Sequence, residues 1–467
     1  VPALAADTQV SADGLTYTFK IRDDAFWSNG DPVKADDFVF AWQRAVDPKV
    51  ASEYAFIITD VAQIKNSAAV NKGEKPLEEL GVKAVDDKTL EVTLETPVTF
   101  FASLLYFPTF YPINRAFFEK CGDTFATSPE TVLSNGAFVL KSYEPAATSF
   151  ELVKNDKYYD AARVKLDGLS YQVIKDSQTA LLSYQNGDLD VVTLSGDQVE
   201  LVQDDPEFTT MNAGYLWYVT VNQAQYPELA NVNFRKALSA AFDRDAIATS
   251  IVKDGSTPAT FAVPSGFCMG PDGKDFRETG NTYEGSDKAK AAEYYKAACE
   301  ELGKDSFSLT LLVEDNATAQ DVAAFIQQEW TSTLPGVQVE LKVETKKQRV
   351  QDIQDGNYNV CLTRWGPDYA DPMTYLNMWI TGNSNNYGNW SNADYDKIIN
   401  SCISGELALD PTARWQGLKD AEKIVMDNAV ILPVYQKANA MMIKTGVKGI
   451  ECHAIALNRV FKDTTKE

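Results

Sequence analysis

Strand-like and helix-like segments alternate between Leu216 and Tyr435, and this alternation is the strongest constraint on the fold. The strand-like segments are short and apolar, whereas the helix-like segments place apolar side chains at helical spacing. Strands that alternate with helices favour an α/β domain wound around a sheet. The expected strands are residues 217–222, 308–313, 337–343, 358–363 and 429–435, and the expected helices are residues 233–248, 318–334 and 414–427.

The opening block predicts a small α+β domain. Asp13 and Gly14 form a turn signal before an alternating strand at residues 15–21. Ala35 opens an amphipathic helix that Pro48 ends. A second strand pair follows at residues 81–85 and 89–94.

Residues 114–193 have a different pattern. Strands are expected at residues 135–143, 149–154 and 169–174. A helix that begins at Asp176 and ends at Gly187 follows, and then a buried strand. This strand–helix–strand order predicts parallel pairing.

Length, charge and reactive side chains restrict the class of protein. A chain of 467 residues is too long for one core, so two or three domains are expected. The formal net charge of -23 argues against nucleic acid or an anionic membrane surface as the main partner. The single histidine, His453, excludes a multi-histidine metal site. The 6 cysteines include no C-x-x-C pair, which disfavours structural zinc and leaves their pairing open.

The sequence lacks the motifs of the common enzyme classes. It contains no G-x-S-x-G nucleophile motif and no glycine-rich phosphate loop. Paired carboxylates such as Asp36 and Asp37 leave a secreted glycoside hydrolase open as an alternative. A multi-domain α/β chain without catalytic motifs favours a binding protein with a ligand cleft between lobes.

Residues 364–377, RWGPDYADPMTYLN, form the candidate binding loop. Two prolines and a glycine hold its backbone in an irregular path after a strand. Trp365, Asp368, Tyr369 and Asp371 lie on this path, a combination suited to a small cationic or amine-bearing ligand. The alternative is that the two aromatic residues belong to the core and that the aspartates cap a helix beginning near Pro372.

Four blocks, in order, resemble the extracellular solute-binding family 5, the peptide-binding lipoproteins of ABC importers. They are WSNGDPVKADDFVFAW at residues 27–42, GDLDV at 187–191, NFRKALSAAFDR at 233–244 and AVILPVY at 429–435. The resemblance covers nearly the whole chain. It is strongest to the oligopeptide-binding group, through residues 47–54 and 365–372.

The resemblance implies a two-lobed, periplasmic-binding-protein-like α/β fold of three hinge-linked domains. It also implies that family members begin before Val1 and that this N-terminal segment is missing here. The expected parts are a small α+β domain at residues 1–112, a first α/β lobe at 113–215 and 437–467, and a second α/β lobe at 216–436.

The implied function is that of a receptor, not an enzyme, which captures oligopeptides in the cleft and delivers them to the permease of an ABC importer. No cofactor or metal is expected. The protein would be a monomer outside the cytoplasm, in the periplasm or held at the cell surface by an N-terminal lipid anchor. Alternatives are another cargo on the same fold (dipeptide, nickel chelate, haem or oligosaccharide) or a surface sensor or adhesin.

The resemblance also implies roles for individual residues. Asp368 would hold the α-ammonium group of the peptide, with Trp365 and Tyr369 as walls, while Asp371 is assigned to a helix cap. Some relatives carry a disulfide beside the ligand, and Tyr218 and Gly366 fall at its positions. The remaining expected ligand-binding residues are Arg364, Gly366, Tyr54, Asn385, Asn386 and Tyr435.

Overall fold

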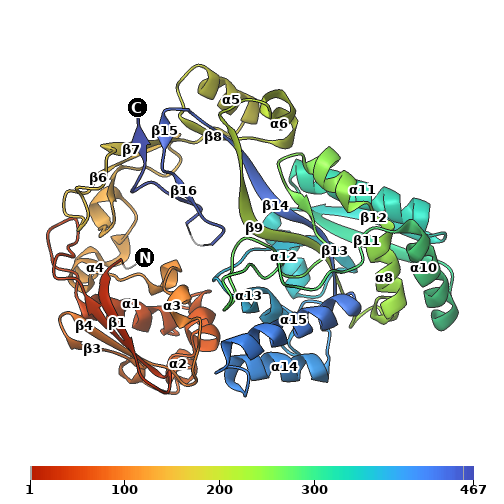
Figure 1. Ribbon diagram of the computed structural model, residues 1–467, viewed down its shortest axis with the longest axis horizontal. Helices are drawn as coiled ribbons and strands as arrows, with labels where there is room; N and C mark the ends of the chain where they lie inside the picture. The colour runs from red at the N-terminus through yellow and green to blue at the C-terminus, as the bar shows by residue number, and fades with distance from the viewer. Residues whose placement is uncertain (1–2, 456) are drawn as a thin grey trace. The chain divides into compact units, whose positions relative to one another are not determined.

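The computed structural model describes residues 3–455 and 457–467, which belong to two compact units (Figure 1). Unit 1 comprises Val1–Ser183, Lys444–Cys452 and Arg459–Glu467. Unit 2 comprises Tyr184–Ile443 and His453–Asn458. The division into three domains stays a prediction.

Unit 1 begins with a four-stranded antiparallel sheet in the order β1-β2-β4-β3. The predicted hairpin is confirmed, since the Ser11 N–H donates to the Thr16 carbonyl at 2.9 Å. Gly14 turns the chain there with a φ of 70°, which glycine adopts without strain. The strands are β1 (Ala5–Val10), β2 (Thr16–Ile21), β3 (Val82–Asp86) and β4 (Thr89–Thr93).

Helix α1 (Ala35–Val46) packs on this sheet, and the family-like block at residues 27–42 anchors its start. The Trp27 indole N–H donates to Asp37 Oδ2 at 2.9 Å, and the Lys34 backbone N–H donates to the same oxygen at 3.0 Å. Both side chains are buried, and burial raises the pKa of Asp37. The block therefore has a structural role within unit 1.

A three-stranded sheet in unit 1 contains β5 (Phe138–Ser142), β6 (Ser149–Lys154) and β7 (Gly168–Gln172). Its pairings are antiparallel. The sequence predicts parallel pairing of the strands before and after the helix at residues 176–187. That prediction is wrong, because β7 lies in this sheet whereas β8 (Val191–Thr193) pairs antiparallel with β14 (Ile431–Ile443) in another sheet. Parallel neighbours need a long crossover, usually a helix. A short turn joins β5 to β6, and in the described chain no helix lies between β6 and β7. The further elements of unit 1 are α2 (Ser67–Asn71), α3 (Phe101–Leu104), α4 (Arg115–Cys121), β15 (Val447–Lys448), β16 (Glu451–Cys452), β17 (Arg459–Val460) and β18 (Thr465–Lys466).

Unit 2 is built on a mixed sheet in the order β10-β14-β9-β13-β11-β12, with β8 also paired to β14. Strand β11 runs parallel to β12 and β13, as strand–helix alternation predicts, whereas β9 runs antiparallel to β13 and β14. The strands are β8 (Val191–Thr193), β9 (Phe208–Val221), β10 (Thr257–Pro258), β11 (Phe307–Glu314), β12 (Val337–Glu344), β13 (Val360–Trp365) and β14 (Ile431–Ile443).

Helices cover both faces of this sheet. On one face, Phe234 of α8 and Trp330 of α11 join strand residues such as Val219 in the main core. On the other face, Ile353 of α12 packs with Leu312 and other buried strand residues. The helices of unit 2 are α6 (Gly196–Val202), α7 (Pro227–Ala230), α8 (Val232–Ala241), α9 (Arg244–Ala246), α10 (Lys288–Leu302), α11 (Ala317–Thr333), α12 (Lys346–Gln354), α13 (Met373–Leu376), α14 (Ala393–Ser404) and α15 (Pro411–Asp427), and α5 (Ser177–Gln185) lies at the boundary of the two units.

The helix predicted at residues 233–248 is interrupted. Phe242 is extended, and Asp243 starts α9 by accepting the Ala246 N–H at 3.0 Å. The buried Arg244 guanidinium donates to the carbonyls of Ala259 and Pro433. Buried donors need partners, so these contacts hold the chain out of a continuous helix.

The cysteines, all within the described residues, form no disulfide. Cys268, Cys361 and Cys402 are buried thiols, and Cys452 is exposed. The sequence left the pairing of the cysteines open, and in this structure all of them are free thiols.

Candidate functional site

The candidate loop leaves the end of β13 in unit 2. The antiparallel register pairs Arg364 with Trp217 and Trp365 with Leu216 of β9. The backbone then departs from the sheet and enters α13 after Pro372. The strand, irregular loop and short helix predicted for residues 358–377 are confirmed.

Asp368 is a partly buried carboxylate without a counter-charge. Its backbone N–H donates to Thr374 Oγ1 at 3.0 Å, which fixes the loop to α13. Within residues 3–455 and 457–467, no basic side chain pairs with its carboxylate. Burial raises its pKa to about 6, because the ionised form loses hydration. An entering cation would supply the missing charge.

Asp371 lies in the same loop but is fully paired. Its Oδ1 accepts the Met373 N–H at 3.0 Å, which confirms the predicted helix cap. Arg414 of α15 also donates to both its oxygens, at 2.7 and 2.9 Å. Both side chains are buried, so this pair joins the loop to α15 and leaves no site for a ligand cation.

The two aromatic residues of the loop differ in exposure. Tyr369 is buried, with 3% of its surface exposed, and thus belongs to the core. Trp365 is only partly buried, although its Nε1 is enclosed and has no hydrogen-bond partner in the described chain. Trp365 therefore retains surface that a ligand could contact.

Gly366 lies against Tyr215 of β9. A Cβ atom built on Gly366 would lie 2.5 Å from Tyr215 Cε1, so the ring occupies the space of a side chain. Tyr218, which the resemblance sets with Gly366 at the positions of a disulfide in some relatives, pairs with Thr363 in the strand register.

Arg364 belongs to a partly buried ion pair. Its Nη1 donates to Glu314 Oε1 at 2.7 Å, and its guanidinium lies 4.7 Å from the centre of the Trp217 ring. Trp217 stacks in turn on Tyr435 at 5.6 Å, and Tyr435 is 1% exposed. Tyr435 thus supports Arg364 from within the sheet and is itself enclosed.

Asn385 and Asn386 lie in the loop before α14 and behave differently. The Asn386 amide is buried, and it donates to the Trp390 carbonyl at 2.7 Å and accepts the Trp390 N–H at 3.1 Å. Asn385 is partly exposed, and its Oδ1 accepts the Tyr387 hydroxyl at 3.2 Å. Asn386 therefore shapes the loop, whereas Asn385 keeps polar surface accessible.

Tyr54 belongs to unit 1. It is 42% exposed and contacts Phe56 and Phe107, with ring centres 5.7 and 5.0 Å apart. An exposed aromatic group at this position is compatible with ligand contact.

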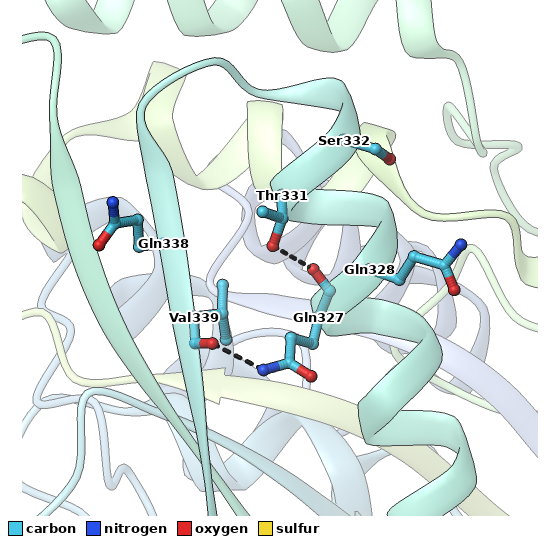
Figure 2. A pocket seen from close by; sticks show the side chains of 6 residues that line it. All are labelled: Gln327, Gln328, Thr331, Ser332, Gln338 and Val339. Atoms are coloured by element: carbon cyan, nitrogen blue, oxygen red, sulfur yellow. Dashed lines mark hydrogen bonds between the residues drawn. The ribbon is translucent and has the colours of Figure 1, made fainter.

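A separate hollow of about 530 Å³ lies between α11 and β12 (Figure 2). The Gln327 side-chain amide donates to the Val339 carbonyl at 2.7 Å, so its main polar group is already used. No charged side chain is among the six residues that line it. This hollow contains none of the predicted site residues and offers no specific chemistry for a ligand.

Sequence reasoning missed several residues that shape the loop. Arg414 neutralises the charge of Asp371, and Glu314 neutralises that of Arg364. Thr374 fixes the Asp368 backbone, and the Tyr215 ring covers Gly366. None of them carries a local signal, since each acts through a contact between separate elements. Arg414 lies 43 residues from Asp371.

Residues 1–387 match the family described as "Bacterial extracellular solute-binding proteins, family 5 Middle". The chain belongs to this family. It is 34% identical over 468 residues to the dipeptide-binding protein of Lactococcus lactis subsp. cremoris (strain MG1363), which covers 97% of this chain and 84% of that protein. It is 32% identical over 459 residues to the oligopeptide-binding protein OppA of Bacillus subtilis (strain 168), which covers 96% and 81%.

Solved structures of relatives have the same fold. The substrate-binding domain of an oligopeptide ABC transporter from Bacillus anthracis str. Ames matches with a TM-score of 0.84 and 40% identity, covering 100% of this chain and 90% of that one. Listeria monocytogenes OppA bound to peptide matches with a TM-score of 0.83 and 36% identity, over the same shares of the two chains. The periplasmic-binding-protein-like α/β fold predicted from the sequence is confirmed, and the family is one of binding proteins.

The described residues contain neither a helix able to span a membrane nor a metal-binding cluster. None of the helices there is long and apolar enough to cross a membrane. In the same residues, no three His, Cys, Asp or Glu side chains are grouped as a metal site requires.

Proposed function

We propose that this protein captures peptides outside the cytoplasm and delivers them to the permease of an ABC importer, without catalysing a reaction. Membership of the solute-binding family supports the receptor role. The names of its relatives, among them dipeptide- and oligopeptide-binding proteins, support a peptide cargo.

The observation that carries the proposal is the unpaired carboxylate of Asp368. A peptide's α-ammonium group would neutralise it and restore the electrostatic balance lost by burial. The peptide backbone would then extend from this point and pair with polar main-chain groups, as in other strand-like modes of peptide binding.

The other predicted residues take roles that follow from their exposure. Trp365 and Asn385 contact the ligand, because each keeps accessible surface. Arg364 offers donors beyond those that Glu314 uses, and Gly366 leaves room for the ring of Tyr215. Tyr369, Asn386 and Tyr435 are buried and hold these groups in place. Tyr54, within unit 1, keeps an exposed aromatic ring.

Calorimetry with matched peptides tests the cargo and the site together. A peptide with a free amino terminus should bind, and its N-acetylated form should bind at least about tenfold more weakly, because acetylation removes the charge that pairs with Asp368. Equal affinity for the two forms would contradict the role of Asp368. Failure of every peptide, from dipeptides upward, would contradict the peptide cargo.

A second cargo deserves a parallel measurement. The chain is 30% identical over 462 residues to a probable deoxycholate-binding periplasmic protein, YgiS of Escherichia coli (strain K12), so membership of this fold does not by itself select peptides. Deoxycholate carries a negative charge, which Asp368 would repel. Tight deoxycholate binding without peptide binding would favour this alternative.

The proposal also includes the oligomeric state of the protein and its attachment to the membrane. The protein acts as a monomer and touches the membrane through a lipid attached to its N-terminal region and through the permease. Light scattering of the purified protein checks the mass. Metabolic labelling of the full-length protein in its host with a radioactive fatty acid checks the anchor.

A further inference from the structure

We propose that Tyr215 presents its aromatic ring to the ammonium group held at Asp368, so that the two side chains together select a cationic ligand terminus. This inference rests on the proposed function and adds a residue that the sequence patterns did not mark. It also assigns a purpose to the glycine at position 366.

Tyr215 lies where β9 passes the end of β13. Because Leu216 pairs with Trp365, the preceding residue faces Gly366. A Cβ atom on Gly366 would lie 2.5, 2.7 and 2.9 Å from Cε1, Cζ and Cδ1 of the Tyr215 ring. These separations are far below van der Waals contact, so the ring rests directly on the glycine backbone. Gly366 is needed here for space.

One short helix holds both members of the proposed pair. Thr374 of α13 accepts the backbone N–H of Asp368 at 3.0 Å. The neighbouring Tyr375 donates its hydroxyl to the carbonyl of Gly214 at 2.5 Å, directly before Tyr215. Tyr375 is fully buried, so this link is rigid. Two adjacent residues of α13 thus fix the backbones that carry Asp368 and Tyr215.

Tyr215 and Asp368 also meet the same short segment of the loop. The Tyr215 ring rests on Gly366, and Asp368 follows Gly366 by two residues.

Part of the Tyr215 ring is open to a ligand. Tyr215 remains 40% exposed although one part of its ring is pressed on Gly366. The face of an aromatic ring attracts a cation, and more strongly where water is partly excluded, as it is around Asp368.

Affinity measurements on two Tyr215 variants test the ring. Tyr215→Phe keeps the ring and should bind a free-amine peptide within about twofold of the unmodified protein. Tyr215→Leu keeps an apolar side chain but removes the ring, and it should weaken binding about 5- to 30-fold. Gly366→Ala displaces the ring and should weaken binding over the same range. Thermal unfolding of each variant without ligand provides the control for folding.

A double-mutant cycle with Asp368→Asn separates this inference from the proposed function. If the ring acts on the ammonium group, Tyr215→Leu should cost much less in the Asp368→Asn background, because the cation is no longer held there. Equal losses in both backgrounds, or equal losses for the free and N-acetylated peptides, would overturn the role of Tyr215 and leave the peptide receptor standing. If the unmodified protein binds no peptide, the proposed function itself fails.

Discussion

Asp368 and Asp371 occupy the same loop, yet only one of them is neutralised by the protein. Asp371 accepts two hydrogen bonds from Arg414 and one from the start of α13. Asp368 has a raised pKa and no basic partner in the described chain. A buried charge that a fold leaves unpaired lowers stability, so its retention points to a partner from outside. The comparison indicates that Asp371 stabilises the structure of the loop, whereas Asp368 is available to bind a ligand.

The largest expected effect, on stability, comes from breaking the ion pair between Asp371 and Arg414. Arg414→Leu leaves the buried Asp371 carboxylate without its counter-charge, and should lower the free energy of unfolding by about 3–5 kcal/mol. Urea denaturation of the ligand-free protein measures this loss. The double variant Asp371→Asn with Arg414→Leu should recover part of the stability, because no unpaired charge remains. A loss below about 1 kcal/mol in the single variant would mean that the pair is not a structural link.

Removing the unpaired charge should affect ligand binding instead. Asp368→Asn keeps the shape of the side chain but removes the charge that the α-ammonium group would meet. The binding free energy for a free-amine peptide should weaken by about 2–5 kcal/mol, measured by calorimetry. Asp321→Asn, an exposed acidic residue on α11, is the matched control and should bind as the unmodified protein does. Unchanged affinity in Asp368→Asn would remove this residue from the site.

Local patterns in the sequence were sufficient to locate the loop but not to distinguish its two aspartates. Strand β13, the irregular path after it and the cap of α13 depend on residues close together in the chain, and all three were predicted. The partner of Asp371 is Arg414, from another helix, and the ring on Gly366 belongs to Tyr215 of an antiparallel strand. Only the packed sheet brings these residues together.

The same limit explains the errors in the fold. Residues 114–193 contain strands that were correctly placed, but local periodicity carries no information about which strands pair. The family resemblance helped with architecture, because it reports on a whole chain. It gave no indication of Tyr215, because the contact of this ring with Gly366 depends on strand register.

The stability of the ligand-free protein should rise when the unpaired charge is removed. The pKa of Asp368 is about 6 in the folded protein, against 3.8 for an ordinary aspartate exposed to solvent. The folded state therefore binds this proton more tightly than the unfolded chain does. Folding stability from this group therefore falls as pH rises from about 4 to 6 and stays low above that range. Asp368→Asn should raise the free energy of unfolding by about 1–3 kcal/mol at pH near 8, and the gain should vanish below about pH 4. Denaturation across this range measures it, and a gain independent of pH would show that desolvation of the carboxylate is not its cause.

The smallest expected effect concerns peptide affinity and pH. The α-ammonium group stays protonated below pH of about 7.7, so the changing partner in acid is Asp368. Its protonation, with a pKa of about 6 in the free protein, removes the charge that binds the cation. The dissociation constant should thus be nearly constant from pH 7 to 6.5 and rise about tenfold per unit well below 6. Calorimetry with a peptide lacking acidic side chains isolates this titration, and Asp368→Asn should abolish it. A dissociation constant that stays flat down to about pH 5 in the unmodified protein would contradict an ionised Asp368 as the group that binds the amine.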